Sequence, residues 1–273
     1  MRYDGVPNRM NRRRFVAGLF SAGVGASVAG CLGSTGADTG SPRPVETLPP
    51  SATAGFDYVD ADDVRAHDEL RIRDYSVPRS VGGIPGVSLD QVNGAVAFGE
   101  RNATVTAEGE FNVSEASTAL GSEGFTESDG REGYRLFERY DGAVALDGET
   151  CIRSALGPDA VRRTVDASAD TGVKATDTDD GFASLVDALG NGTFVTGRAV
   201  YDDPVVARGK RVGTEAGGST AEVTVVRVFR TEAEATNRTA TVNATADGGI
   251  RGRVAESDGR VVRVTGEADV DRL

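Results

Sequence analysis

The stretch that decides the fold is residues 133–154, GYRLFERYDGAVALDGETCIRS, in which two Asp-Gly pairs separate three short apolar runs. An Asp-Gly pair between alternating apolar residues is a strong sequence signal for a two-residue hairpin turn. The pattern therefore predicts three consecutive antiparallel strands, at 133–140, 143–146 and 149–154.

Further strands and three helices are expected before and after these three strands in the sequence. Asn112 followed three residues later by Glu115 is a capping-box signal, and it predicts a helix through about Leu120. Pro158 marks the first turn of a second helix, and apolar residues spaced for one helix face predict a third. The remaining expected elements here are strands at 95–98, 104–111 and 194–201 and the third helix at 180–189.

The same succession of strand, helix and hairpin strands appears again near the end of the chain. Thr231, followed by Glu232 and Glu234, predicts a helix start, and strands are expected at 221–229, 239–246, 249–256 and 260–267. The fold class predicted is therefore α+β, with antiparallel sheets, helices packed on one face, and possibly two related strand–helix–hairpin units.

Composition divides the chain into six segments. The short apolar beginning and the Pro- and Thr-rich stretch after it cannot build a core, whereas the later segments carry the strand and helix patterns. We expect a signal peptide at 1–30, a tether at 31–55, an irregular lead-in at 56–92, α+β unit one at 93–201, a linker loop at 202–220 and α+β unit two at 221–273.

The chain begins with an export signal of the twin-arginine kind. Arg12 and Arg13 form the pair, and Phe15 stands where this motif has Phe or Leu. The apolar run that follows is rich in Gly, Ala and Ser and is too short for a membrane span, which needs about 20 strongly apolar residues. A short apolar core behind a basic region is typical of a cleavable signal.

The apolar run ends in Val28-Ala29-Gly30-Cys31, which resembles the lipobox of exported lipoproteins. Val28 stands where that motif usually has Leu. The resemblance implies that Cys31 becomes the first mature residue and carries a lipid on its sulfur. The alternative is an ordinary secretory signal with a cysteine there by chance. The lipid would place the mature chain on the outer face of the cell membrane, held by a flexible tether.

The charge balance is strongly acidic. The full chain has 30 Lys and Arg against 42 Asp and Glu; losing residues 1–30 removes five arginines and one aspartate, which leaves 25 against 41, a net charge of −16. Such a surface repels itself in dilute buffer and is screened in molar salt. It argues against nucleic-acid binding, which needs a basic stripe. The alternative is an acidic protein of ordinary salinity that binds cations or basic partners.

These features together resemble a group of poorly characterised, twin-arginine-exported lipoproteins of salt-loving archaea. The features shared are the lipid signal, the Pro/Thr tether, a Gly-Gly-Ile-Pro-Gly segment at residues 82–86 and the helix–hairpin repeats. The resemblance implies an address on the cell surface but carries no known activity.

Potential N-glycosylation sites are unusually frequent in this chain. Of the six asparagines after residue 30, five lie in Asn-x-Ser/Thr, the acceptor pattern of secreted proteins. Any one of them could instead be an ordinary turn or cap residue. The candidates are Asn102, Asn112, Asn191, Asn237 and Asn243.

No catalytic or metal-binding motif stands out in the sequence. The single histidine, His67, has no Gly-x-Ser-x-Gly nucleophile to serve, and we expect it at the surface. Cys151 is expected to be a small buried hydrophobe rather than a reactive thiol. The acidic run 177–181 has the wrong spacing for an EF-hand, so Asp179 or Asp180 is expected to cap the helix after it. No catalytic residue, metal or cofactor is predicted.

The sequence thus predicts a lipid-anchored extracellular protein, non-enzymatic, that binds a protein or envelope partner. Two alternatives remain: an extracellular hydrolase that uses carboxylates alone, and a solute-binding lipoprotein of an importer. A hydrolase would require two carboxyl groups about 5–10 Å apart in a concave pocket. An importer's binding protein would require two lobes around a cleft.

Overall fold

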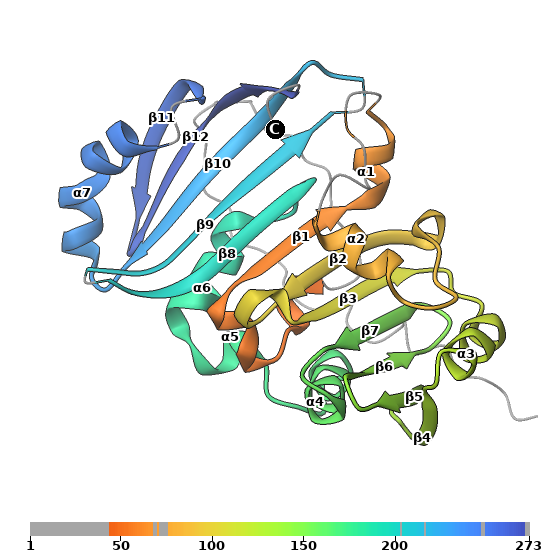
Figure 1. Ribbon diagram of the computed structural model, residues 1–273. Coiled ribbons are helices and arrows are strands. Elements are labelled where there is room, and N and C mark those ends of the chain that lie inside the picture. The colour runs from red at the N-terminus through yellow and green to blue at the C-terminus, as the bar shows by residue number, and fades with distance from the viewer. Residues whose placement is uncertain are drawn as a thin grey trace, which may run out of the picture. The chain divides into compact units, whose positions relative to one another are not determined.

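The computed structural model describes residues 44–67, 70, 76–202, 204–215, 217–246 and 249–270. These residues form one antiparallel sheet of twelve strands in the order β11-β12-β10-β9-β8-β1-β2-β3-β7-β6-β5-β4 (Figure 1). The predicted signal peptide, with Arg12, Arg13 and Phe15, and the predicted lipid-bearing Cys31 lie outside the described residues.

The strands and helices have the following bounds. The strands are β1 Phe56–Asp60, β2 Val92–Phe98, β3 Thr104–Gly109, β4 Thr126–Arg131, β5 Tyr134–Arg139, β6 Gly142–Leu146, β7 Thr150–Ser154, β8 Phe194–Asp202, β9 Val205–Thr214, β10 Thr220–Phe229, β11 Arg251–Asp258 and β12 Val261–Asp269. The helices are α1 Ala61–Arg65, α2 Ser76–Gly82, α3 Val113–Ser122, α4 Pro158–Ser168, α5 Ala175–Thr178, α6 Asp180–Leu189 and α7 Glu232–Thr245, with 3₁₀ turns η1 Pro44–Thr47, η2 Pro50–Ala54, η4 Leu89–Gln91 and η5 Glu100–Asn102.

The α+β class with antiparallel strands is confirmed, and the strand order repeats within the sheet. The first half runs β1-β2-β3-β7-β6 and the second half β8-β9-β10-β12-β11, each with a helix, α3 or α7, after its third strand. The two halves meet at the antiparallel pair β1–β8. The hairpin of β4 and β5 extends the first half only. The halves contain β1 to β7 and β8 to β12, so their bounds differ from those of the units expected at 93–201 and 221–273.

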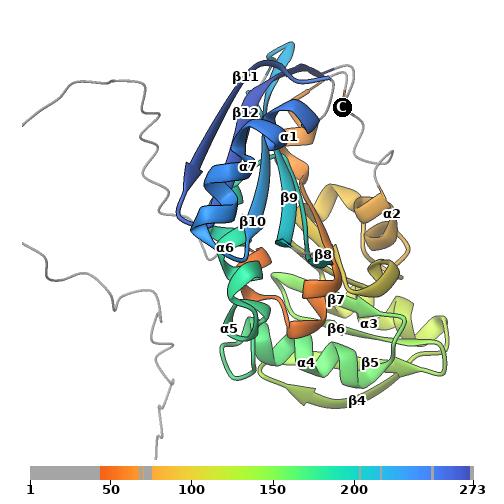
Figure 2. The same cartoon turned by 90° about the vertical axis from the view of Figure 1, so that its left-hand side faces the viewer.

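The strand registers define two faces of the sheet. Phe56 and Tyr58 point to one face, here called the Phe56 face, and Val59 points to the other, the Val59 face. Helices α4, α5 and α6 cover the Phe56 face, whereas α1, α2, α3 and α7 cover the Val59 face (Figures 1 and 2). The sequence predicted helices on one face, and the structure divides them between both faces.

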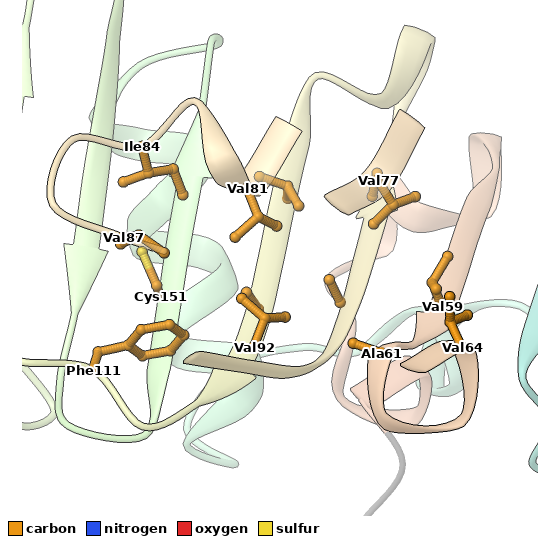
Figure 3. Packing of buried hydrophobic residues seen from close by; sticks show 14 of the residues in the cluster. Val59, Ala61, Val64, Val77, Val81, Ile84, Val87, Val92, Phe111 and Cys151 are labelled. Carbon is orange, nitrogen blue, oxygen red and sulfur yellow. The ribbon is translucent and has the colours of Figure 1, made fainter. Parts of the chain in front are cut away.

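The largest buried cluster lies on the Val59 face. Figure 3 shows Val77 and Val81 of α2, and Ile84 and Val87 of the loop after it, packed beside Val92 of β2. Phe111 and the buried Cys151 belong to the same cluster. On the Phe56 face, Phe56 packs edge-to-face on Phe182 of α6, with ring centroids 5.7 Å apart. Both faces are therefore anchored by apolar contacts to helices.

Two predicted irregular segments belong to the folded body. The expected lead-in at 56–92 contains β1, which lies at the centre of the sheet between β2 and β8. The last part of the expected tether at 31–55 forms η1 and η2, in which Val45 and Ala52 are buried. The prediction was wrong here because a single five-residue strand and two short turns leave little periodicity to detect.

The linker expected at 202–220 is also wrong. It contains the whole of β9, which pairs with β8 and β10 over its length. Its glycines and basic residues hide the strand pattern in the sequence. Gly209 is required there because a Cβ would lie 2.5 Å from the carbonyl oxygen of Thr196.

The strand expected at 239–246 is instead the second half of α7. Thr231 caps this helix, and Ala235 and Val242, seven residues apart, bury one side of it. The hydroxyls of Thr239 and Thr245 donate to carbonyls four residues back, so these β-branched residues fit the helix. The cap and the tertiary contacts override the local strand preference.

Candidate functional site

A pocket of about 450 Å³ lies on the Phe56 face, at the end of β1. Strand alternation aims Phe56, Tyr58 and Asp60 at this face, so the strand runs from an apolar to an acidic side chain along one row. We call this site the Tyr58 pocket. Its lining is Pro44, Val45, Phe56, Tyr58, Asp60, Asp63, Glu108, Val186, Leu189, Gly190, Asn191, Gly192, Val195, Gly213 and Thr214.

A hydrogen-bond network fixes the acidic end of the pocket. Asp60 caps α1 by accepting from the Asp63 amide at 2.9 Å, and its own amide donates to the Thr193 carbonyl at 2.9 Å. The Asp63 carboxylate accepts from the Thr193 hydroxyl at 3.0 Å, and that hydroxyl lies 2.8 Å from the Thr214 hydroxyl. The two aspartates are therefore held in place by the junction of β1, α1 and β8.

Tyr58 lies across β2, where Gly94 leaves room for its ring. A Cβ at Gly94 would lie 3.1 Å from the Tyr58 hydroxyl oxygen. Burial, the negative charges of Asp60, Glu108 and Asp63, and a hydrogen bond to Asp60 raise the pKa of Tyr58 well above its ordinary value. The phenol therefore stays protonated and acts as a hydrogen-bond donor.

Two carboxyl groups of the pocket, those of Asp60 and Glu108, have raised pKa values and are harder to ionise than free ones. Burial is the main cause that raises the pKa of Asp60, with the nearby negative charge of Asp63 adding to it. Burial alone raises the pKa of Glu108. Groups whose pKa values are raised by desolvation inside a pocket are often functional, because the fold retains them at a cost in stability.

A second hollow of about 510 Å³ adjoins the pocket, and the two share Pro44 and Glu108. Tyr134 lines it from β5, and burial is the main cause that raises the pKa of this phenol. Thr106, two residues before Glu108 on the same face of β3, also lines it and is 7% exposed. Within the described part of the chain, the Thr106 hydroxyl has no hydrogen-bond partner.

The two hollows have one sign of charge. Asp60, Asp63 and Glu108 line the pocket, and Glu108, Glu110 and Glu149 line the hollow beside it. The described residues that line either one include no lysine or arginine. Together with the apolar wall of the pocket, this charge suits a molecule that has both a positive group and an apolar part.

The sequence did not single out this site. Tyr58 and Asp60 fell in the expected irregular lead-in, and Glu108 was one acid among many. The detectable signal was the period-two order of Phe56, Tyr58 and Asp60, which places three chemically different side chains on one face.

Of the residues that the sequence did single out, Asn191 lines the Tyr58 pocket, whereas His67, Cys151 and Asp179 do not. His67, expected at the surface, is 3% exposed, and neither ring nitrogen has a partner within the described part of the chain. Cys151 is buried as expected, and burial raises the pKa of its thiol to about 12. Asp179 caps α6 as expected, accepting from the Phe182 amide at 2.8 Å. Tyr134 and Phe137 are buried on opposite faces.

The five candidate glycosylation sites differ in accessibility. Asn112, Asn191 and Asn237 are exposed, with Asn112 capping α3 and Asn191 at the edge of the Tyr58 pocket. Asn102 is half-buried and donates its side-chain amide to Asp57 at 2.7 Å. Asn243 is also half-buried, and its side-chain oxygen has no partner in the described residues.

Two further findings concern the described residues only. Among them, no group of three or more His, Cys, Asp or Glu side chains is arranged to hold a metal ion. No helix in the described ranges is both long enough and apolar enough to cross a membrane.

Comparison with known proteins gives distant structural similarities. No family model and no curated protein matches the chain. Crystal form I of TP0453 is 9% identical with a TM-score of 0.47, and the match covers 85% of this chain and 95% of that chain. Crystal form IV is 8% identical with a TM-score of 0.48, covering 82% and 94%, and form III is 8% identical with a TM-score of 0.45, covering 82% and 95%.

Proposed function

We propose that this chain is a lipid-anchored protein of the outer cell surface that binds a small organic cation in the Tyr58 pocket. The observation that carries the binding role is the Tyr58 pocket itself, where an apolar wall meets Tyr58, Asp60 and Glu108. Its volume of about 450 Å³ is in the range of small-molecule sites. An ammonium group would neutralise the carboxylates, and Val186, Leu189 and Val195 would contact the apolar part.

The anchor in this proposal rests on the sequence. Arg12, Arg13 and Phe15 fit an export signal, and Cys31 fits a lipidation site. Thirteen residue steps separate Cys31 from Pro44, which span about 45 Å at most. Because Pro44 lines the pocket, the lipid would hold the pocket within that distance of the membrane.

The binding test is isothermal titration calorimetry with putrescine and with choline in molar potassium chloride. We expect binding that tightens as pH rises, because a cation favours the ionised form of Asp60 and Glu108. Glu108→Gln should weaken it at least tenfold and flatten the pH dependence. Glu115→Gln removes the same charge from exposed α3 and serves as the matched control. If neither putrescine nor choline bound, the proposal that the Tyr58 pocket binds an organic cation would be refuted.

The anchor test is mass spectrometry of the native protein purified from membranes. We expect the mature chain to begin at Cys31 with a lipid on its sulfur. A Cys31→Ser variant should leave the membrane fraction while its folded part keeps its amine affinity. Recovery of the unprocessed chain from the cytosol would refute the proposed membrane anchor, but it would not bear on amine binding in the Tyr58 pocket.

A carboxylate hydrolase is the second candidate, because Asp60, Asp63 and Glu108 line one pocket. Burial raises the pKa of Glu108, which is the property that a general acid requires near neutral pH. Release of nitrophenol from aryl glycosides in molar salt, lost in both Glu108→Gln and Asp60→Asn, would favour this candidate. Amine binding without turnover would favour the binding protein.

A further inference from the structure

A third hollow, of about 500 Å³, lies on the opposite side of the sheet from the Tyr58 pocket. It lies on the Val59 face over β8, β9 and β10, which run side by side between α7 and β1 in Figure 1. Five of its lining residues are basic, in a chain where acids outnumber bases by 42 to 30. They are Arg101, Arg198, Arg208, Lys210 and Arg227.

Three of these side chains form a row across the sheet, here called the arginine row. Arg198 of β8 is directly opposite Arg208 of β9, and Arg208 is directly opposite Arg227 of β10. Directly opposed residues on neighbouring strands point to the same face with Cβ atoms about 5 Å apart. Like charges in these positions repel, so the row is an unfavourable arrangement unless a negative group joins it.

The described residues around the hollow supply little negative charge. Asp57 is the one acid in its lining, and its carboxylate already accepts from the Asn102 amide at 2.7 Å. Arg227 donates to the Thr245 hydroxyl of α7 at 3.3 Å, which is a neutral partner. Within the described ranges, no ion pair involves Arg198 or Arg208.

The cross-strand positions of these three arginines distinguish them from the others. Some arginines of the chain lie beside carboxylates, as Arg135 does with Glu127 at 2.6 Å, and others donate to neutral oxygens, as Arg263 does to the Ala188 carbonyl at 3.3 Å. The arginine row differs because its three members are direct neighbours across β8, β9 and β10 with no acid between them. Guanidinium groups present planar donor forks that match phosphate and sulfate oxygens.

We propose that the arginine row is an oxyanion site that binds a phosphate or sulfate group on the Val59 face. The group would lie over β9, where Arg208 stands between Arg198 and Arg227, with Lys210 and Arg101 at the edges. Gly55 and Gly99 on the far wall have no side chains to block it. This site lies on the other face from the Tyr58 pocket and does not rest on the function proposed for that pocket.

The direct test is titration with inorganic phosphate while potassium chloride keeps the ionic strength constant, because added salt alone screens charges. We expect saturable binding, seen by calorimetry and by a rise in melting temperature. Arg208→Gln should weaken it at least tenfold, whereas Arg163→Gln, which removes an exposed arginine of α4, should leave it unchanged. Equal binding by the wild type and Arg208→Gln would overturn the proposal.

A second variant separates the site from a general effect of charge. Arg208→Glu places a carboxylate between Arg198 and Arg227, so its melting temperature without phosphate should exceed that of the wild type. Phosphate should no longer raise the melting temperature of the Arg208→Glu variant. A variant that melts lower than the wild type and still responds to phosphate would contradict the proposal.

The source of the bound group is distinguished by vesicles. Phosphatidic acid vesicles should be bound and then released by free phosphate if the group belongs to a lipid headgroup. Binding of inorganic phosphate without vesicle binding would assign the site to a soluble ligand. Binding of neither would overturn the site.

Discussion

At the scale of single residues, the carboxyl of Glu108 is the clearest case of a buried ionisable group that opposes folding at neutral pH. Burial raises the pKa of this group, so its ionised form is disfavoured in the folded protein. The folded state therefore binds the proton more tightly than the unfolded chain does. Below the unfolded pKa of about 4.3 the group is protonated in both states and carries no penalty. As pH rises through the higher folded value, the cost of ionising the buried group lowers stability.

Glu108→Gln is accordingly expected to stabilise the protein at neutral pH and to make no difference near pH 4. Because the side chain is half-buried, water screening limits the gain to about 1 kcal/mol or less. Urea unfolding at several pH values measures it, with the exposed Glu110→Gln as control. A gain that is the same at pH 4 and pH 7 would show that the effect is not ionisation.

His67 is a second residue held at a cost. It is 3% exposed, and both ring nitrogens lack hydrogen-bond partners within the described residues. A buried polar group without a partner costs about 1–3 kcal/mol. His67→Leu should therefore raise the free energy of unfolding by an amount of that order, measured by urea denaturation. His67→Asn, which stays polar, should give no such gain, and a less stable leucine variant would contradict the argument.

At the scale of elements, α7 is held by a capping box at its start and by a narrow row of buried side chains. Of its fourteen residues, the buried ones are Ala235 and Val242. Thr231 and Glu234 bond reciprocally, with the Glu234 amide 3.3 Å from the Thr231 hydroxyl and the Thr231 amide 3.1 Å from the Glu234 carboxylate. A helix with so narrow an apolar side draws much of its stability from such a capping box.

Thr231→Ala should therefore cost about 1 kcal/mol and speed hydrogen exchange of the α7 amides before those of the sheet. Thr231→Ser keeps the accepting oxygen and should retain protection. Exchange mass spectrometry resolves the two cases. Unchanged exchange in the alanine variant would mean that contacts with β11 and β12 alone hold the helix.

Local sequence signals predict some elements of this fold and miss others, among them the second half of α7. The two hairpins and the cap at Asn112 were predictable from local signals, although the first turn is formed by Tyr140 and Asp141, and Gly142 already pairs with Arg139 in the sheet. The second half of α7 was not, since Thr239 and Val242 favour strands locally and only the contact with β12 decides. β1 and the Tyr58 pocket depend on partners distant in sequence, and the period-two order of Phe56, Tyr58 and Asp60 does not identify those partners.

At the scale of the whole molecule, the repeated strand order gives the sheet two chemically distinct faces. The halves meet at β1–β8, and both proposed sites lie close to this junction. The Tyr58 pocket uses the Phe56 face of β1, and the arginine row begins at Arg198 on the Val59 face of β8. The two proposed sites would therefore lie on opposite faces of the same strand junction.

Net charge acts on the same scale and makes stability depend on salt. The full chain carries −12, and with residues 1–30 removed 25 bases face 41 acids, which is −16. Self-repulsion in such a chain is screened as the Debye length falls from about 10 Å at 0.1 M salt to about 3 Å at 1 M. The melting temperature should therefore rise between 0.1 and 2 M potassium chloride.

A charge-reversed variant tests this cause directly. Glu123→Lys, Asp129→Lys and Asp187→Lys change exposed acids for which the described residues show no ion pair, and together they raise the net charge by six. If repulsion between acids limits stability, the triple variant should melt higher than the wild type at 0.1 M salt and converge with it at 2 M. Parallel salt curves for the two proteins would instead assign the salt effect to stronger burial of apolar surface, which does not depend on these charges.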